Sequence, residues 1–258
     1  SQEMNKLISL VIKDILKNKV ILVYTLFLAA FGWSVFSLES SSAKGVLSLL
    51  NIILLSVPLV SIIFANIYIY NSREFIELLV SQPIKRSTLW NSIFIGLLIA
   101  INLAFLVGIG IPVLIFSANT VGFSVILTGL FIGSIFTSLA MMGSIMAKDK
   151  ARGIGLSIMI WLFLSLIYDG LLLFFMFQFA DYPIEKPMVL FSAMNPIDLA
   201  RIQMLLQIDV SALMGYTGAI FKKFFGNFYG YLITIGLLLL WIIIPYWISL
   251  RKFNKKDL

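Results

Sequence analysis

The chain has 258 residues, of which 60% are hydrophobic and only 12% are charged. A soluble globular domain typically holds about 45–50% apolar and about 25% charged residues, so this composition indicates an integral membrane protein. Histidine and cysteine are both absent, which excludes the usual zinc sites, disulfides and catalysis by Cys or His. The net charge of +7 bears first on membrane topology, and no nucleic-acid partner is needed to explain it.

Residues 1–19 are expected to form an amphipathic helix in the membrane interface. Apolar side chains recur there at helical spacing, and the lysines fall on the opposite face. The apolar set is Met4, Leu7, Ile8, Val11, Ile12, Ile15 and Leu16. Such a helix anchors the chain on the bilayer surface, or it serves as an elbow on which a cytoplasmic partner docks. The two roles are compatible.

Six apolar stretches are long enough, at about 20 residues each, to cross a bilayer as helices. They cover residues 20–38, 46–70, 89–116, 121–147, 154–179 and 229–250. The third is long for one crossing and contains Gly108, Gly110 and Pro112, so we expect it to tilt or break there. The sequence therefore predicts one all-α transmembrane domain over residues 1–258, without a cleavable signal peptide.

The distribution of basic residues predicts the orientation of this domain. Six crossings place both termini on the same side, and that side holds fourteen of the 19 lysines and arginines. The other side holds five. Because cytoplasmic flanks carry an excess of Lys and Arg, both termini are predicted to be cytoplasmic.

The loop over residues 71–86, between the second and third crossings, is expected to contain a short helix. Asn71 is predicted to cap it with Glu74 at the third helical position, a capping-box arrangement, and Pro83 is predicted to end it. Its apolar side chains are Phe75, Ile76, Leu79 and Val80. They suit a groove on another protein, or, as an alternative, the lipid headgroup region.

The run Ser72-Arg73-Glu74 … Glu77-Leu78-Leu79-Val80-Ser81-Gln82-Pro83-Ile84-Lys85-Arg86 resembles the coupling-helix region of type-2 ABC exporter permeases. The resemblance extends over the whole chain in length, span count and amphipathic start. It implies a bacterial inner-membrane permease that pairs with a second copy of itself and with two cytoplasmic ATPase chains. The coupling residues that it implies are Arg73, Glu74, Phe75, Ile76, Glu77, Leu79, Val80 and Pro83.

No phosphate-binding Gly-x-x-x-x-Gly-Lys-[Ser/Thr] motif occurs in the sequence. Any ATP and Mg²⁺ are therefore expected to be bound by the partner ATPase, and this chain is predicted to be a non-catalytic subunit with no cofactor. The ten methionines are scattered, and without Cys or His nearby they favour packing over copper ligation. No metal site is predicted in this chain.

Asp169 is the one ionisable residue well inside a predicted crossing, and its neighbour Tyr168 is a candidate hydrogen-bond partner. An acid inside a membrane is costly, which makes Tyr168 and Asp169 a candidate intramembrane polar site. The site is either an anchor for the outer segment or a polar group satisfied by a neighbour or water. An intramembrane protease is a remote alternative, because it needs two carboxylates and no other predicted crossing carries one.

Residues 180–228 form the largest predicted segment outside the bilayer, and two short helices are expected there. Asn195 and Pro196 are a typical helix start, with Asp198 in the first turn and Arg201 close enough to pair with it. Residues 210–225 are expected to form the second helix. These helices either cap the crossings or form a platform for a periplasmic partner.

The run Asn195-Pro196-x-Asp198-x-x-Arg201, after Tyr168-Asp169-x-Leu171-Leu172, is similar to NosY-type permeases, which serve the copper-site maturation of nitrous oxide reductase. The resemblance implies a NosF-type ATPase on the coupling helix and a periplasmic β-helical NosD-type protein on the outer helices. The predicted residues for the latter are Asn195, Pro196, Asp198, Arg201 and Met204. In that family the permease transmits ATP-driven movement. The alternative within the same fold is an exporter of lipid, peptide or drug.

Overall fold

The computed structural model describes residues 2–39, 42–82, 84–179, 181–182, 184–207 and 222–255. Its helices, in chain order, are α1 Gln2–Leu16, α2 Lys19–Leu38, α3 Ser42–Asn71, α4 Arg73–Val80, α5 Arg86–Phe105, η1 Leu106–Gly110, α6 Ile111–Phe116, α7 Thr120–Met146, α8 Lys150–Leu162, η2 Phe163–Ile167, α9 Tyr168–Gln178, α10 Glu185–Ala193, α11 Pro196–Gln207 and α13 Phe228–Lys255. Six helical stretches are long and apolar enough to cross a membrane. The predicted all-α fold with six crossings is confirmed.

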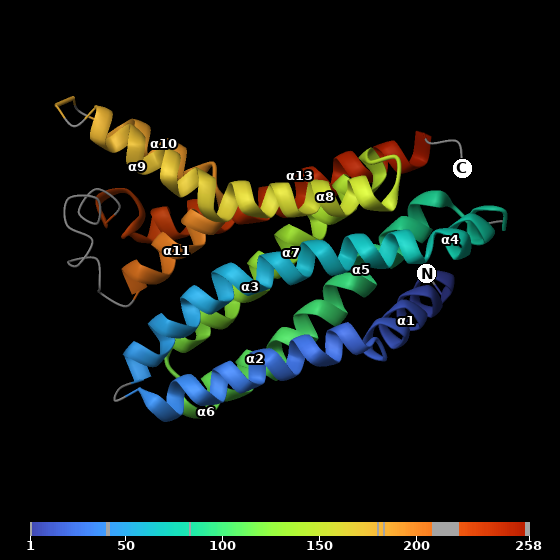
Figure 1. Ribbon diagram of the computed structural model, residues 1–258, viewed down its shortest axis with the longest axis horizontal. Coiled ribbons are helices and arrows are strands. Elements are labelled where there is room, and N and C mark those ends of the chain that lie inside the picture. Colours follow the sequence, from blue (N-terminus) through green and yellow to red (C-terminus); the bar gives the residue numbers. More distant parts are fainter. Residues whose placement is uncertain are drawn as a thin grey trace.

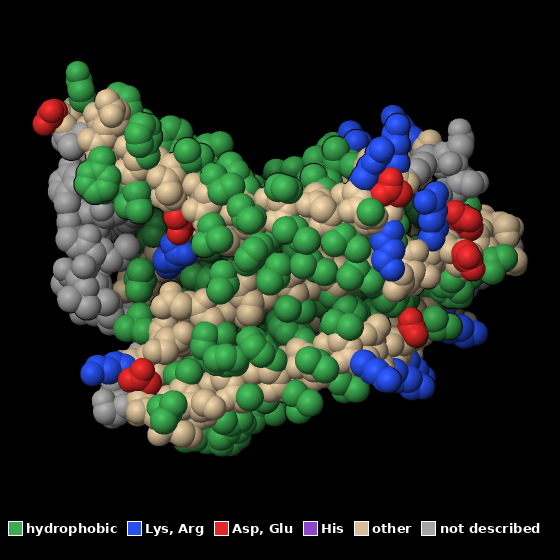
Figure 2. All heavy atoms as spheres, in the orientation of Figure 1, with side chains coloured by type: hydrophobic (Ala, Val, Ile, Leu, Met, Phe, Trp, Pro, Cys, Tyr) green, Lys and Arg blue, Asp and Glu red, His purple; other side chains and the backbone are tan. Residues whose placement is uncertain are grey.

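The long helices lie side by side as one bundle with two different ends (Figure 1). The first and last described residues lie at one end together with α4, and α10 and α11 lie at the other. Figure 2 shows most of the Lys and Arg side chains of the visible face at the first end, beyond a largely hydrophobic middle. We call these the α4 end and the α11 end. The middle suits a bilayer, where backbone groups are satisfied inside helices.

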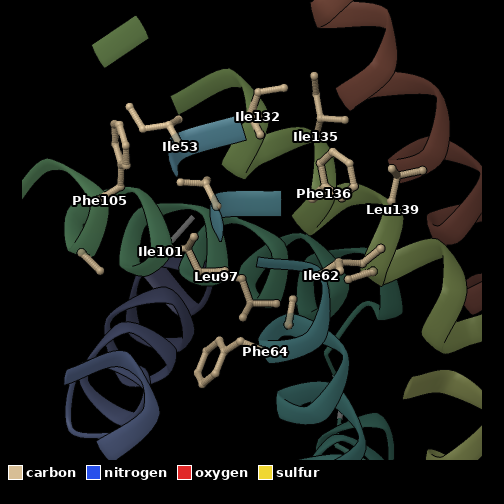
Figure 3. Packing of buried hydrophobic residues seen from close by; sticks show 14 of the residues in the cluster. Ile53, Ile62, Phe64, Leu97, Ile101, Phe105, Ile132, Ile135, Phe136 and Leu139 are labelled. Atoms are coloured by element: carbon tan, nitrogen blue, oxygen red, sulfur yellow. The ribbon is translucent and has the colours of Figure 1, made fainter. Parts of the chain in front are cut away.

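Helix α7 is the centre of the bundle, and 78% of its apolar 18-residue stretch is buried inside the protein. Figure 3 shows side chains of α3, α5 and α7 meeting in one cluster. Fully buried members include Ile53 of α3, Phe105 of α5 and Phe136 of α7. Glycines in α7 permit this close approach, since a Cβ on Gly129 would lie 2.0 Å from Cζ of Phe105.

The third crossing departs from a regular α-helix at the position predicted from Gly108, Gly110 and Pro112. Residues Leu106–Gly110 form the π-helical turn η1, and the helix continues as α6. A Cβ on Gly108 would lie 2.6 Å from Cβ of Leu28, so the glycine lets α2 lie directly against this turn. The crossing is therefore interrupted by a π-helical turn without being broken, a common irregularity within α-helices.

Candidate functional sites at the two ends of the bundle

Helix α4 begins at the end of α3 and is fixed there by contacts between crossings. The Tyr70 hydroxyl donates to the carbonyl oxygens of Ser144 (3.1 Å) and Ala147 (3.3 Å) at the end of α7. Lys150 Nζ donates to Oδ1 of Asn71 at 2.8 Å. These bonds join the end of the second crossing, directly before α4, to the fourth and fifth crossings.

The predicted capping box at the start of α4 is wrong. Asn71 belongs to the end of α3, and Ser72 occupies the N-cap position without a side-chain cap. The Asn71 side chain accepts the Lys150 bond instead. Glu74 still lies in the first turn of α4, where the helix dipole favours an acid.

One face of α4 is built into the bundle. Ile76 is only 4% exposed and lines a small cavity with Ile69, Tyr70, Arg73, Trp90, Ser144, Ile145, Ala147 and Phe253. Beneath it, the rings of Trp90 and Phe253 stack at 4.3 Å, and Trp90 Nε1 donates to Ser249 Oγ at 3.0 Å. The third and sixth crossings therefore end directly under the coupling-helix candidate.

The opposite face of α4 is open to a partner. Phe75 is 38% exposed and Leu78 is 67% exposed, and Glu74 and Glu77 flank them on the surface. Glu77 pairs with Arg73 at 3.0 Å in an exposed i,i+4 arrangement, which contributes a few tenths of a kcal/mol.

This geometry corrects part of the predicted set of coupling residues. Ile76 is buried, and Leu79 and Val80 pack partly against the core, because they lie on the helix face turned toward the crossings. Leu78, which is not among the predicted coupling residues, is the most exposed apolar side chain of α4. Pro83 lies outside the described residues.

At the α11 end, three charged side chains form one cluster. Arg201 Nη1 lies 2.7 Å from Oδ2 of Asp169 and 3.2 Å from Oδ1 of Asp198. Asp169 belongs to α9 in the fifth crossing, and the other two belong to α11. One guanidinium therefore joins the fifth crossing to α11, and the predicted pairing of Asp198 with Arg201 is confirmed.

Asn195 adds a second connection between α11 and the fifth crossing. Its Nδ2 donates to the carbonyl of Leu164 at 2.8 Å, and its Oδ1 accepts from the backbone N–H of Ile197 at 3.0 Å. Leu164 lies in the π-helical turn η2, where the regular hydrogen-bond ladder is interrupted. Pro196 is the first residue of α11, so the predicted helix start is confirmed.

Tyr168 makes a third connection, with a partner that the sequence did not indicate. Its hydroxyl donates to the carbonyl of Phe191 at 2.6 Å, so it holds α10 rather than Asp169. The ring of Phe191 also lies edge-on to Phe175 of α9, at 5.2 Å between centroids. Both α10 and α11 are thereby fastened to the half of the fifth crossing at the α11 end.

The surroundings of Asp198 favour its neutral form. Burial raises the pKa of Asp198 to about 8, and the neighbouring Asp169 acts in the same direction, while Arg201 and Asn195 act in the opposite direction. Oδ1 of Asp169 and Oδ2 of Asp198 are buried without a hydrogen-bond partner among the described residues. The cluster contains two carboxylates and one guanidinium, and a bound proton relieves the excess negative charge.

The residues predicted to bind a periplasmic protein point inward. Asn195, Pro196, Asp198 and Met204 are buried, and Arg201 is partly buried in its ion pairs. These side chains hold α11 in place, and their contact with a periplasmic partner stays a prediction. The exposed side chains beside them are Lys186, Leu190 and Met194, on or just after α10.

The two helices expected in the outer segment are accounted for only in part. Helix α11 is present, α10 was missed, and most of the second predicted helix, at 210–225, lies outside the described residues. The second carboxylate beside Asp169 was also missed, because it comes from α11 and not from another crossing.

Six membrane crossings, an amphipathic first helix and a short anchored helix at the α4 end define the architecture of a transporter membrane subunit. The model of the ABC-2 family transporter proteins matches residues 12–258, and the chain belongs to that family. It is thus a multi-pass membrane subunit of an ABC transporter, of the kind that pairs with a cytoplasmic ATPase subunit. No curated protein matches the chain.

Proposed function

We propose that this chain transmits the ATP-driven movement of its ATPase from α4, through the bundle, to the α10–α11 segment outside the membrane. The observation that carries the proposal is the anchoring of both ends to the same crossings. The end of α3, directly before α4, is bonded to α7 and α8, and α8 continues through η2 into α9, which holds α10 and α11. A continuous helical segment between two anchored sites is a physical connection through which a displacement of one site acts on the other.

The ATPase docks on the exposed face of α4 in this proposal. That face offers Phe75 and Leu78 as apolar anchors with Glu74 and Glu77 beside them, a combination suited to a groove with basic edges. Both termini then lie in the cytoplasm, in agreement with the excess of Lys and Arg expected on that side. ATP and Mg²⁺ are bound by the ATPase.

Replacement of both anchors tests the docking site. Phe75→Glu with Leu78→Glu should reduce co-purification of the ATPase by about tenfold or more, because each loses an apolar contact and adds a desolvated charge. Tyr182→Glu with Tyr229→Glu changes two exposed side chains at the α11 end, and this control should retain the ATPase. Normal retention by the α4 variant would show that the ATPase docks elsewhere.

We further propose that the chain serves the copper-site maturation of nitrous oxide reductase as a NosY-type permease. Support comes from the run Asn195-Pro196-x-Asp198-x-x-Arg201 and from the structural use of these residues in fastening α11. In this function a NosD-type β-helical protein contacts the exposed side of α10, at Lys186, Leu190 and Met194. The permease supplies movement, and copper is handled by the periplasmic subunits.

The partner and the pathway can be tested separately. Tagged chain should retain a periplasmic β-helical protein, and Leu190→Glu with Met194→Glu should release it while the ATPase stays bound. Cells that lack the chain should accumulate nitrous oxide reductase deficient in copper. A full copper content in these cells would exclude the maturation role, and it would leave an exporter of lipid, peptide or drug as the function.

A homodimer completes the proposed assembly. In the fifth crossing, Lys150–Gln178, only 11% of the apolar 18-residue stretch is buried within the chain. A second copy packed against this crossing would bring two α4 helices to two ATPase subunits, and would place the transmitting helix at the centre of the complex. Cross-linking through single cysteines on α8 would capture such a dimer.

A further inference from the structure

A groove runs between α1, the start of α2 and the last turns of α3, near the α4 end. Its volume is about 480 Å³, within the usual range of ligand sites. The lining residues are Asp14, Asn18, Val20, Leu59, Val60, Ile63, Phe64, Ile67, Tyr68, Asn71 and Ser72. We call this the α1–α3 groove. It is separate from the α4 face and from the cluster around Arg201.

The groove is divided into a polar part and an apolar part. Asp14, Asn18, Asn71 and Ser72 lie at the ends of α1, α2 and α3, next to the α4 end. The other lining residues, apart from Tyr68 with its hydroxyl, are apolar. Those on α3 lie deeper in the crossing. This is the arrangement that an amphiphile meets at the edge of a bilayer, with its head group outward and its chain inward.

The charges of the groove indicate the sign of the head group. Asp14 is the single Asp, Glu, Lys or Arg among the lining residues, and it forms none of the ion pairs found in the described part of the chain. Its carboxylate interacts with the Tyr68 hydroxyl, which also interacts with Ser72. At the edge of the groove near α4, Lys150 Nζ lies 2.8 Å from Oδ1 of the lining residue Asn71.

We propose that the α1–α3 groove binds a membrane lipid with an ammonium head group. The ammonium donates to Asp14 and to the neighbouring amide and hydroxyl oxygens, the phosphate lies toward Lys150, and the first part of an acyl chain covers Val60, Ile63 and Ile67. A charge-assisted hydrogen bond to a carboxylate gives the preference for this head group. The bound lipid thereby joins the amphipathic helix α1 to Ser72, the N-cap of α4.

Lipid binding to the purified full-length chain in detergent tests this site. Phosphatidylethanolamine and phosphatidylglycerol with identical acyl chains are offered at equal concentration, and bound lipids are identified by native mass spectrometry. The chain should prefer phosphatidylethanolamine about fivefold, and Asp14→Asn should remove the preference. Asp181→Asn, which removes an exposed acid far from the groove, should keep it.

A second pair of variants tests the location without changing charge. Leu59→Trp fills the apolar part of the groove and should reduce binding of phosphatidylethanolamine by about fivefold. Leu26→Trp adds the same volume at an exposed position of α2 and should have no effect. Equal binding of the two lipids by the unaltered chain, a preference that survives Asp14→Asn, or normal binding by Leu59→Trp would each overturn the proposal.

Discussion

Three charged side chains hold α11 against the fifth crossing, and their balance depends on one proton. Arg201 contacts Asp169 and Asp198 at 2.7 and 3.2 Å, but one guanidinium cannot neutralise two carboxylates. Asp198 is 5% exposed, so the remaining charge is unfavourable in its surroundings. A proton on Asp198 leaves one ion pair and one neutral acid, which is the more stable arrangement for a carboxyl group buried as Asp198 is.

The stability of this junction should fall as the pH rises. The pKa of Asp198 is raised by burial from 3.8 to about 8 in the folded chain, so folding favours the protonated form. The stabilisation is complete below the unfolded pKa, near 4, and is lost as the pH increases through about 8. The midpoint of thermal unfolding should therefore be lower at about pH 8.5 than at about pH 6.

Asp198→Asn provides the control for this pH dependence, because an amide is neutral at every pH and has nearly the same shape. The variant should show a flatter pH profile than the unaltered chain. If the two profiles have the same slope between these values, Asp198 does not carry the proton.

Between helices, the packing of α5 against α7 depends on a glycine of α7 at the point of contact. Phe105 is fully buried, and its ring occupies the space that a side chain on Gly129 would need. Gly129→Ala should therefore destabilise the chain by about 1–3 kcal/mol through overpacking. Thermal unfolding in detergent measures this as a lower midpoint.

Gly236 of α13 is the matched control for Gly129, since nothing lies within 4 Å of a Cβ built on it. Gly236→Ala should leave the midpoint unchanged or raise it slightly, because alanine is the better helix former. An equal loss of stability in both variants would show that the contact with Phe105 is not what requires glycine at position 129.

The elements that the sequence predicted well are those governed by local signals. Long apolar runs identify the six crossings because only helices of that length satisfy their backbone in lipid. Asn195 and Pro196 identify the start of α11 because capping is a local interaction. Helix α10 was missed because its N-cap, Ile184, has no side-chain cap, so no local signal marks its start.

The function of individual side chains was predicted less well, because it depends on which face of a helix meets the bundle. Phe75 and Ile76 are neighbours in the sequence, yet one is exposed and the other is buried. The pairing of Asp169 with Arg201 joins residues 32 positions apart, beyond the reach of any spacing rule. Met204, predicted to contact a periplasmic partner, is fully buried in the hydrophobic core of the bundle.

For the whole molecule, the orientation in the membrane can be tested with single cysteines, because the chain contains none. Gln82→Cys lies just after α4, and Asp181→Cys lies at the α11 end, both at exposed positions. A membrane-impermeant maleimide added to intact cells should label Asp181→Cys only, since the excess of positive charge places the α4 end inside. Labelling of Gln82→Cys alone would reverse the orientation.

Movement at the α11 end in response to ATP is the central claim for the whole molecule. Spin labels at Leu190→Cys of α10 and Tyr229→Cys of α13, both exposed positions, report on it in the complex with the ATPase. The distance distribution measured by pulsed electron spin resonance should shift when ATP and Mg²⁺ are added, and Phe75→Glu with Leu78→Glu should abolish the shift. An identical distribution with and without ATP, in a complex that hydrolyses ATP, would contradict transmission from α4 to the outer helices.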